Sequence, residues 1–197
     1  MIDVGRFYET QALQYLDDRD RSRIGVEIVE QWAHSLPLGT AVVEIACGGG
    51  YPVTQVLVNA GLAVWAIDTS PTLLRQFRLR FPRIPTHCAS ALDSNYFGRT
   101  FDAVISIGLV PFLREDEQQA LFRRVSEILE PRGRFLFTAP IETGTWQDVT
   151  TGLECWSLGR IAYTRALQHV GFRVIRTHVD EGENNYYHAE KIGGAAW

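Results

Sequence analysis

Two hydrophobic spacings alternate along the chain, and their order predicts the arrangement of helices and strands. Residues 8–16 and 22–35 carry apolar side chains at the spacing of one helix face, so helices are expected in both segments. Their apolar faces consist of Tyr8, Ala12, Tyr15 and Leu16, and of Ile24, Ile28, Val29 and Trp32. From residue 40, short apolar runs rich in β-branched residues alternate with helical segments. We expect strands over 40–46, 62–67, 85–89, 101–107 and 135–139, and helices over 52–60, 72–81, 114–129 and 157–170.

The last two apolar runs predict a pair of antiparallel strands. Residues 172–179 and 185–192 have strand patterns, and the connection Asp180–Glu183 is too short for a parallel crossover. Alternating strands and helices predict a doubly wound α/β sheet, which this terminal hairpin makes mixed. Residues 141–156 show few periodic positions, so we expect an irregular loop between the fifth strand and the last helix.

Composition narrows the class of protein. The chain has 197 residues, of which 46% are hydrophobic and 21% charged, as is typical of one soluble globular domain. We expect N-terminal helices over 1–36 within that domain, a core over 37–192 and a tail over 193–197. No apolar run suits a membrane helix, and the acidic N-terminus lacks the form of a signal peptide, so a cytoplasmic location is expected.

Three further features disfavour particular ligands. The net charge of −4 disfavours a general nucleic-acid binder, because affinity for phosphates depends on clustered cations. Cys47, Cys88 and Cys155 form no C-x-x-C pair, which suits a reducing compartment and offers no zinc or disulfide framework. The histidines lack the spacing of metal ligands, so no metal is expected.

Candidate chemistry lies at the ends of the first two predicted strands. Ligands of a doubly wound sheet bind beyond the carboxyl ends of the strands, and the glycine-rich turn 47–50 follows the first strand. The alternative for this turn is a plain strand-to-helix connection. Asp68 ends the second strand 18 residues after Gly50, where a carboxylate can accept hydrogen bonds from ribose hydroxyls. Its alternative role, capping the next helix, is already filled by Ser70 before Pro71.

These segments resemble the motifs of the class I S-adenosylmethionine-dependent methyltransferases. The segment 43–50 resembles the family's acidic residue and G-x-G-x-G turn, with Ala46 in place of the first glycine. The segments 66–71, 101–106 and 129–134 resemble the second motif, the fourth-strand motif and the turn before strand five. The resemblance spans residues 42–140 and implies a Rossmann-like seven-stranded mixed sheet in the order 3-2-1-4-5-7-6, with helices at the N-terminus.

The resemblance implies S-adenosylmethionine as cofactor and assigns roles to particular residues. Asp68 would bind the ribose, Leu73 would lie under the adenine, and Glu44 would organise the glycine turn and the donor's amino group. Ser90 stands where the family usually has aspartate, and its hydroxyl would accept from the adenine amino group. The implied cofactor residues are Glu44, Ala46, Gly48, Gly50, Asp68, Thr69, Leu73, Ser90, Ala91, Ile107 and Tyr15. No catalytic residue is identified.

The acceptor site is expected to contain aromatic side chains. By resemblance it would be built from the N-terminal helix, the loop after strand four and the segment after strand five. The candidates are Tyr8, Phe112, Trp146 and Trp156, for each of which packing in the core is the alternative. The motif with which DNA and RNA amino-methylating relatives hold the acceptor nitrogen is absent at residues 108–111. The amphipathic segment 2–18 is expected to form a lid over the donor, with Tyr8 or Tyr15 touching it; a permanently packed helix is the alternative.

Three functions follow from these observations. The first is a methyltransferase that uses S-adenosylmethionine to methylate a small molecule. The second is an NAD(P)-dependent oxidoreductase, although the dinucleotide fingerprint G-x-G-x-x-G from Gly48 would need a small residue at Val53. The third is a non-catalytic S-adenosylmethionine-binding protein. The motifs leave the acceptor, the methylated atom and the oligomeric state open.

Overall fold

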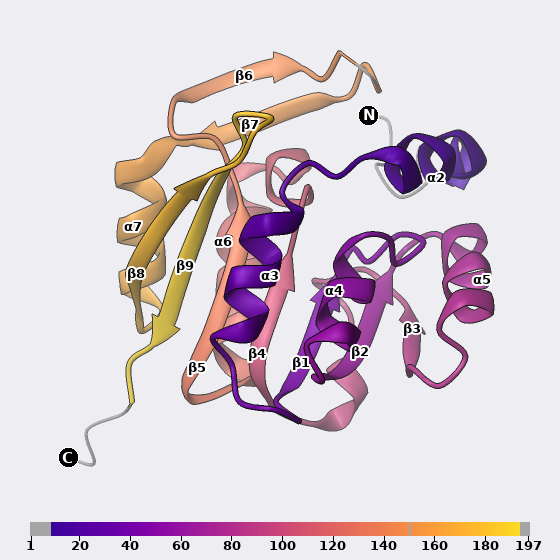
Figure 1. Cartoon of the computed structure of the whole chain (residues 1–197). Helices are drawn as coiled ribbons and strands as arrows, with labels where there is room; N and C mark the ends of the chain where they lie inside the picture. The colour runs from indigo at the N-terminus through magenta and orange to yellow at the C-terminus, as the bar shows by residue number, and fades with distance from the viewer. Residues whose placement is uncertain (1–8, 150, 194–197) are drawn as a thin grey trace.

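The computed structural model describes residues 9–149 and 151–193, which form a seven-stranded central sheet flanked by helices (Figure 1). The strands run in the order β3-β2-β1-β4-β5-β9-β8. Neighbouring strands from β3 to β5 are parallel, whereas β9 is antiparallel to both β5 and β8. The strands are β1 (Ala41–Ile45), β2 (Ala63–Asp68), β3 (Thr86–Cys88), β4 (Phe101–Ser106), β5 (Leu129–Thr138), β8 (Phe172–Val179) and β9 (Asn185–Lys191).

The expected mixed α/β sheet is confirmed. When the strands of the central sheet alone are numbered along the chain, the observed order is the expected 3-2-1-4-5-7-6. The labels differ because two unexpected strands, β6 and β7, intervene in the chain and form a separate sheet. Burial explains why β1 was predictable, since all five of its residues are buried and four of them are apolar, Glu44 being the exception.

Helices cover both faces of the central sheet. The helices are α2 (Ala12–Arg21), α3 (Val26–His34), α4 (Val53–Asn59), α5 (Pro71–Arg80), α6 (Glu115–Ile128) and α7 (Gly159–His169). Short 3₁₀ turns lie at η1 (Tyr96–Gly98) and η2 (Val110–Phe112). One core cluster joins α3 and α4 to the sheet, and a larger one joins α6 and α7 to its other face. In Figure 1, α3 and α4 lie in front of the sheet and α6 lies behind it. The larger cluster is rich in aromatic contacts, such as the stacked rings of Phe137 and Tyr187, whose centroids lie 5.0 Å apart.

The expectation of an irregular loop over 141–156 is wrong. The strands β6 (Thr143–Gln147) and β7 (Glu154–Leu158) pair antiparallel and lie across the carboxyl ends of the central strands, at the top of Figure 1. All five residues of β6 are exposed. A strand with no buried face has no reason to alternate apolar and polar residues, so its main-chain pairing leaves no hydrophobic pattern.

Two element boundaries also differ from expectation. Helix α3 begins at Val26 rather than near residue 22, because Gly25 adopts a left-handed conformation with φ of 77°. Ile24 therefore falls outside the helix and is 42% exposed instead of contributing to its apolar face. Strand β5 begins at Leu129, well before residue 135, and its pairing with β4 contains a register shift between Phe101 and Ala103.

In the described ranges, no helix combines the length and the apolar character needed to cross a bilayer.

Candidate active site

A cavity of about 650 Å³ lies between the carboxyl ends of the central strands and the β6–β7 hairpin. One wall comes from the ends of β1, β2 and β3 and the segments that follow them: Ile45, Ala46, Ile67, Asp68, Thr69, Ala89, Ser90, Ala91 and Leu92. The opposite wall comes from η2, the start of α6 and the hairpin: Leu109, Phe112, Leu113, Arg114, Glu117, Gln147, Gly152, Leu153, Glu154 and Trp156. The location is the one expected for ligands of a doubly wound sheet.

The glycine turn after β1 has a backbone that favours glycine at several positions. Ala46, Gly48 and Gly50 have φ values of 60°, 54° and 90°, all in the left-handed region. For Ala46 this conformation costs about 1–2 kcal/mol, which explains why a glycine suits that position. A Cβ at Gly50 would lie 2.5 Å from Cε2 of Phe81, so a side chain there would clash with this ring, which directly follows α5. The turn is therefore tightly constrained by its neighbours as well as by its φ values.

Asp68 at the end of β2 ties the glycine turn to the next helix. One carboxylate oxygen accepts a hydrogen bond from the amide of Gly48 at 2.8 Å, and the other accepts from the amide of Ser70 at 2.8 Å. Burial raises the pKa of Asp68, although these amide donors oppose that shift. A carboxylate offers about four acceptor sites, more than the amides of Gly48, Ser70 and Thr69 occupy, so Asp68 keeps acceptor capacity for a ligand in the cavity. The expected cap is also present, because Ser70 Oγ accepts from the amide of Leu73 at 3.1 Å.

Glu44 lies behind the glycine turn rather than on the cavity wall. Its carboxyl is buried and accepts a hydrogen bond from the hydroxyl of Thr54 on α4 at 2.5 Å. Burial raises the pKa of Glu44 to about 8, so that the carboxyl retains a proton near neutral pH. Sequence reasoning missed Thr54, because a threonine inside an apolar helical run carries no signal of a buried polar partner.

Helix α2 covers the glycine turn. The nearest atom of Tyr15, its Cε1, lies 3.2 Å from the point where a Cβ on Gly48 would stand, and Leu16 packs over Gly49 in the same way. Arg80 links α5 to this arrangement by donating to a carboxylate oxygen of Asp20 at 2.9 Å and to the carbonyl of Gly49 at 3.1 Å. Burial raises the pKa of the Tyr15 phenol. The turn is thus shielded from one side by the N-terminal segment.

Ser90 begins the part of the wall that follows β3. Its hydroxyl oxygen accepts from the amide of Leu92 at 3.1 Å, which uses one of its two lone pairs. The second lone pair and the hydroxyl proton stay available to a ligand. The serine can therefore serve as acceptor or donor at the position where the resembling family usually has a carboxylate.

The structure brings seven of the expected site residues onto the cavity wall: Ala46, Asp68, Thr69, Ser90, Ala91, Phe112 and Trp156. Leu73 lies elsewhere, packed under α2 with Ala12 and Leu16. Ile107 packs with the α3–α4 cluster, and Trp146 lies on the hairpin with 38% of its surface exposed. The cavity lining does not include Gly48, Gly50, Glu44 or Tyr15, and Tyr8 lies outside the described residues. The ligand contacts of all these residues stay predictions.

Four polar residues of the cavity were not anticipated. Arg114 and Glu117 come from the start of α6, and Gln147 and Glu154 are paired positions of the hairpin. Glu117 also caps its helix, accepting from the amide of Arg114 at 2.8 Å. The acidic start of α6 was visible in the sequence as a helix signal, but the hairpin residues had none, because their strands were not recognised. Within the described ranges, no group of three or more histidine, cysteine, aspartate or glutamate side chains could hold a metal ion.

Comparison with known proteins agrees with this geometry. A family model described as a methyltransferase domain matches residues 42–133. Methyltransferase GfsG of Streptomyces halstedii is 24% identical over 154 residues, covering 74% of this chain and 54% of the relative. The chain therefore spans about half the length of this curated relative.

Solved structures of methyltransferases share the whole fold. Magnesium protoporphyrin IX methyltransferase from Synechocystis PCC 6803, crystallised with bound SAM, has a TM-score of 0.78 at 14% identity, covering 97% of this chain and 98% of that one. The 1,6-didemethyltoxoflavin-N1-methyltransferase of Burkholderia thailandensis has a TM-score of 0.70 at 15% identity, with coverages of 98% and 92%. At these identities the likeness establishes the fold.

Proposed function

We propose that this chain is a class I S-adenosylmethionine-dependent methyltransferase, as its match to a methyltransferase-domain model over residues 42–133 supports, and that it transfers a methyl group from S-adenosylmethionine to a small-molecule acceptor. The observation that carries the proposal is the position of Asp68. Its carboxylate lies on the cavity wall, links the glycine turn to the next loop, and keeps acceptor capacity for a hydroxyl donor.

The residues of the strand-end wall fit the cofactor. Asp68 would accept from the ribose hydroxyls, and Ser90 with Ala91 would lie beside the adenine. The turn from Ala46 to Gly48 would approach the methionine end, where the absence of a side chain on Gly48 lets Tyr15 pack closely from outside. When bound, the cofactor supplies an already activated methyl group, so the protein's task is to align the acceptor and exclude water.

The other wall fits an acceptor of limited size with an apolar body and polar groups. Phe112 and Trp156 offer aromatic surface, while Arg114, Glu117 and Glu154 offer charges of both signs. A volume of about 650 Å³ lies within the range of small-molecule sites, roughly 300–1,000 Å³. Two structural neighbours are methyltransferases named for magnesium protoporphyrin IX and for 1,6-didemethyltoxoflavin, which supports an acceptor of this class. The net charge of −4 disfavours a nucleic acid as substrate.

Calorimetric titration with S-adenosylhomocysteine tests the cofactor. The wild type is expected to bind, and Asp68→Ala is expected to lose detectable binding, because the ribose acceptor and the link to Gly48 both disappear. Asp116→Ala, at an exposed position in the first turn of α6, is the matched control and should bind like the wild type. Unchanged binding by Asp68→Ala would remove the ribose role.

Two further measurements separate the alternatives. Saturable binding of NADH without binding of S-adenosylhomocysteine would overturn the proposal in favour of an oxidoreductase. Incubation with labelled S-adenosylmethionine and a pool of metabolites should label a small molecule. Binding of the donor without transfer to any acceptor would instead favour a non-catalytic binding protein.

A further inference from the structure

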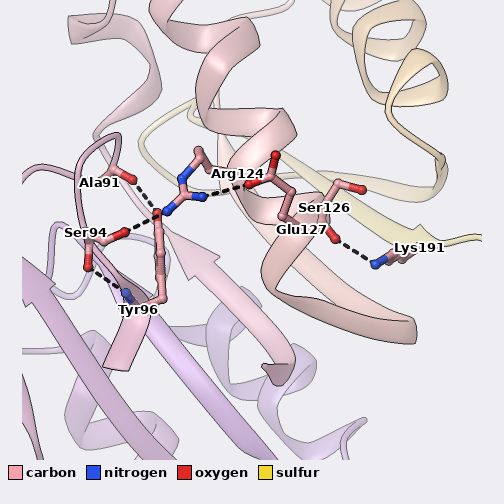
Figure 2. Close-up of polar contacts among 7 residues, drawn as sticks. All are labelled: Ala91, Ser94, Tyr96, Arg124, Ser126, Glu127 and Lys191. Carbon is pink, nitrogen blue, oxygen red and sulfur yellow. Dashed lines mark hydrogen bonds and ion pairs between the residues drawn. The ribbon is translucent and has the colours of Figure 1, made fainter. Parts of the chain in front are cut away.

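A buried tyrosine lies behind the cavity wall formed by Ser90, Ala91 and Leu92. The side chain of Tyr96 has no exposed surface, and its hydroxyl donates to the main-chain carbonyl of Ala91 at 2.6 Å (Figure 2). Tyr96 itself does not line the cavity. Its only polar group is therefore used to hold a carbonyl of the wall from the side away from the ligand.

The backbone at Tyr96 is strained, and local hydrogen bonds compensate for the strain. Tyr96, Phe97 and Gly98 have φ values of 48°, 59° and 64°, and for the first two this conformation costs about 1–2 kcal/mol each. The amide of Tyr96 donates to Ser94 Oγ at 3.0 Å, and that of Phe97 donates to Asn95 Oδ1 at 3.1 Å. This unusual turn directs the Tyr96 ring beneath the wall instead of toward solvent.

Arg124 of α6 holds the same loop from the helix side. Its Nη2 donates to the carbonyl of Ser94 at 2.7 Å, and its guanidinium carbon lies 5.5 Å from the centre of the Tyr96 ring (Figure 2). Glu127 accepts from Nη1 at 2.7 Å and orients the guanidinium. The amide of Ser94 in turn donates to the carbonyl of Ser90 at 2.9 Å. The loop is therefore connected from α6 through Ser94 to both Ser90 and Ala91.

We propose that Tyr96, supported by Arg124, is a positioning residue that holds the Ser90–Leu92 wall in the shape that receives the adenine of the cofactor. The inference rests on the proposed function, which places the adenine at this wall. The wall has no regular structure after β3 ends at Cys88, so its shape depends on these contacts. A preformed wall lowers the ordering cost of binding, which is the physical reason for fixing it in advance.

Tyr96→Phe isolates the hydroxyl, because the ring that fills the core is kept. Calorimetry with S-adenosylhomocysteine and with adenosine is expected to show a Kd raised about fivefold to tenfold for both ligands, the value of one buried hydrogen bond. An equal loss for adenosine is expected because adenosine carries the part that meets the wall. The matched control is Tyr186→Phe, whose hydroxyl donates to Asp180 Oδ2 at 2.9 Å and which does not line the cavity. This control should lose stability while its Kd stays that of the wild type.

A second variant keeps the test decisive where Tyr96→Phe fails to fold. Arg124 is partly exposed, so Arg124→Gln removes the contact to Ser94 at little cost to the core. It is expected to raise the Kd twofold to fivefold. The double variant is expected to raise the Kd by less than the product of the two single fold-changes, because both substitutions act on one loop.

The outcomes distinguish the inference from the function it rests on. If the wild type binds S-adenosylhomocysteine and neither variant changes its Kd, Tyr96 and Arg124 are merely structural and the inference is overturned while the function stands. If the wild type binds no S-adenosylhomocysteine, the proposed function and the inference both fall.

Discussion

At the scale of single residues, burial sets the charge of Glu44. The carboxyl is 4% exposed and has one hydroxyl partner, Thr54, which does not offset the loss of water. Burial raises the pKa of Glu44 from an ordinary value of 4.5 to about 8, so folding takes up a proton between those pH values. The folded state is therefore favoured most below pH 4.5, and this contribution is lost as pH rises toward about 8.

Glu44→Gln is expected to flatten the dependence of stability on pH. The amide resembles a permanently protonated carboxyl, so the free energy of unfolding at pH 8 should exceed that of the wild type by about 1–3 kcal/mol. Urea denaturation between pH 5 and 8 measures the effect. The same substitution at the exposed Glu30 of α3 serves as control and should leave the pH dependence unchanged. Parallel curves for Glu44→Gln and the wild type would contradict the assigned burial effect.

At the scale of elements, one side chain of β9 caps the end of α6. Lys191, the only lysine of the chain, donates from Nζ to the carbonyls of Ser126 and Leu129 at 2.7 Å each, and Figure 2 shows the first of these contacts. The last turn of α6 contains no basic residue of its own. The cation that complements the helix dipole and its terminal carbonyls therefore comes from a strand far away in the chain.

Lys191→Gln is expected to lower the free energy of unfolding by about 1–2 kcal/mol, because two charge-assisted hydrogen bonds at a helix end are lost. Denaturation by urea at neutral pH measures the change. The same substitution at Arg165, an exposed position of α7, removes a charge from a helix surface and should change stability by less than about 0.5 kcal/mol. Equal effects of the two substitutions would show that the cap contributes nothing.

At the scale of the molecule, two separate segments enclose the ligand region. The β6–β7 hairpin lines the cavity itself, while α2 packs over the glycine turn. Figure 1 shows both segments beyond the carboxyl ends of the central strands. An ion pair between Asp20 and Arg80 attaches α2 to α5, and a small apolar cluster of Ala12, Leu16 and Leu73 adds packing between them. Of the ten residues of α2, Ala12 and Leu16 are the buried ones, and a helix with so small a buried face can open at modest cost.

We expect α2 to act as a lid whose opening slows when the cofactor site is filled. Hydrogen exchange of the amides in residues 12–21 should slow several-fold on addition of S-adenosylhomocysteine, because Tyr15 and Leu16 then pack on an occupied turn. Helix α7, on the other face of the sheet, is the internal control and should exchange at the same rate in both states. Equal protection of α2 with and without ligand would indicate a permanently packed helix.

The sequence alone determined the central sheet and the cavity wall that follows its strand ends. A buried parallel strand such as β4 or β1 is rich in apolar residues, and a cap such as Ser70 before Pro71 depends on adjacent residues, so both can be recognised in the sequence. Asp68 could be placed at the cavity because the end of a recognised strand fixes where its last side chain lies. The resembling family usually has glycine at the position of Ala46, which agrees with the left-handed backbone found there.

Only the tertiary structure showed the opposite cavity wall, to which the hairpin contributes, and the side-chain contacts behind the strand-end wall. The strands β6 and β7 pair through their main chains, and all residues of β6 are exposed, so no hydrophobic period indicated this hairpin. For that reason Gln147 and Glu154 were not predicted as cavity residues. The contacts of Tyr96 with Ala91 and of Lys191 with α6 join residues by a hydrogen bond to a carbonyl, which every residue possesses. A main-chain carbonyl cannot be recognised as a partner from the side-chain types in the sequence, and only the folded structure places it at hydrogen-bond distance from the donor.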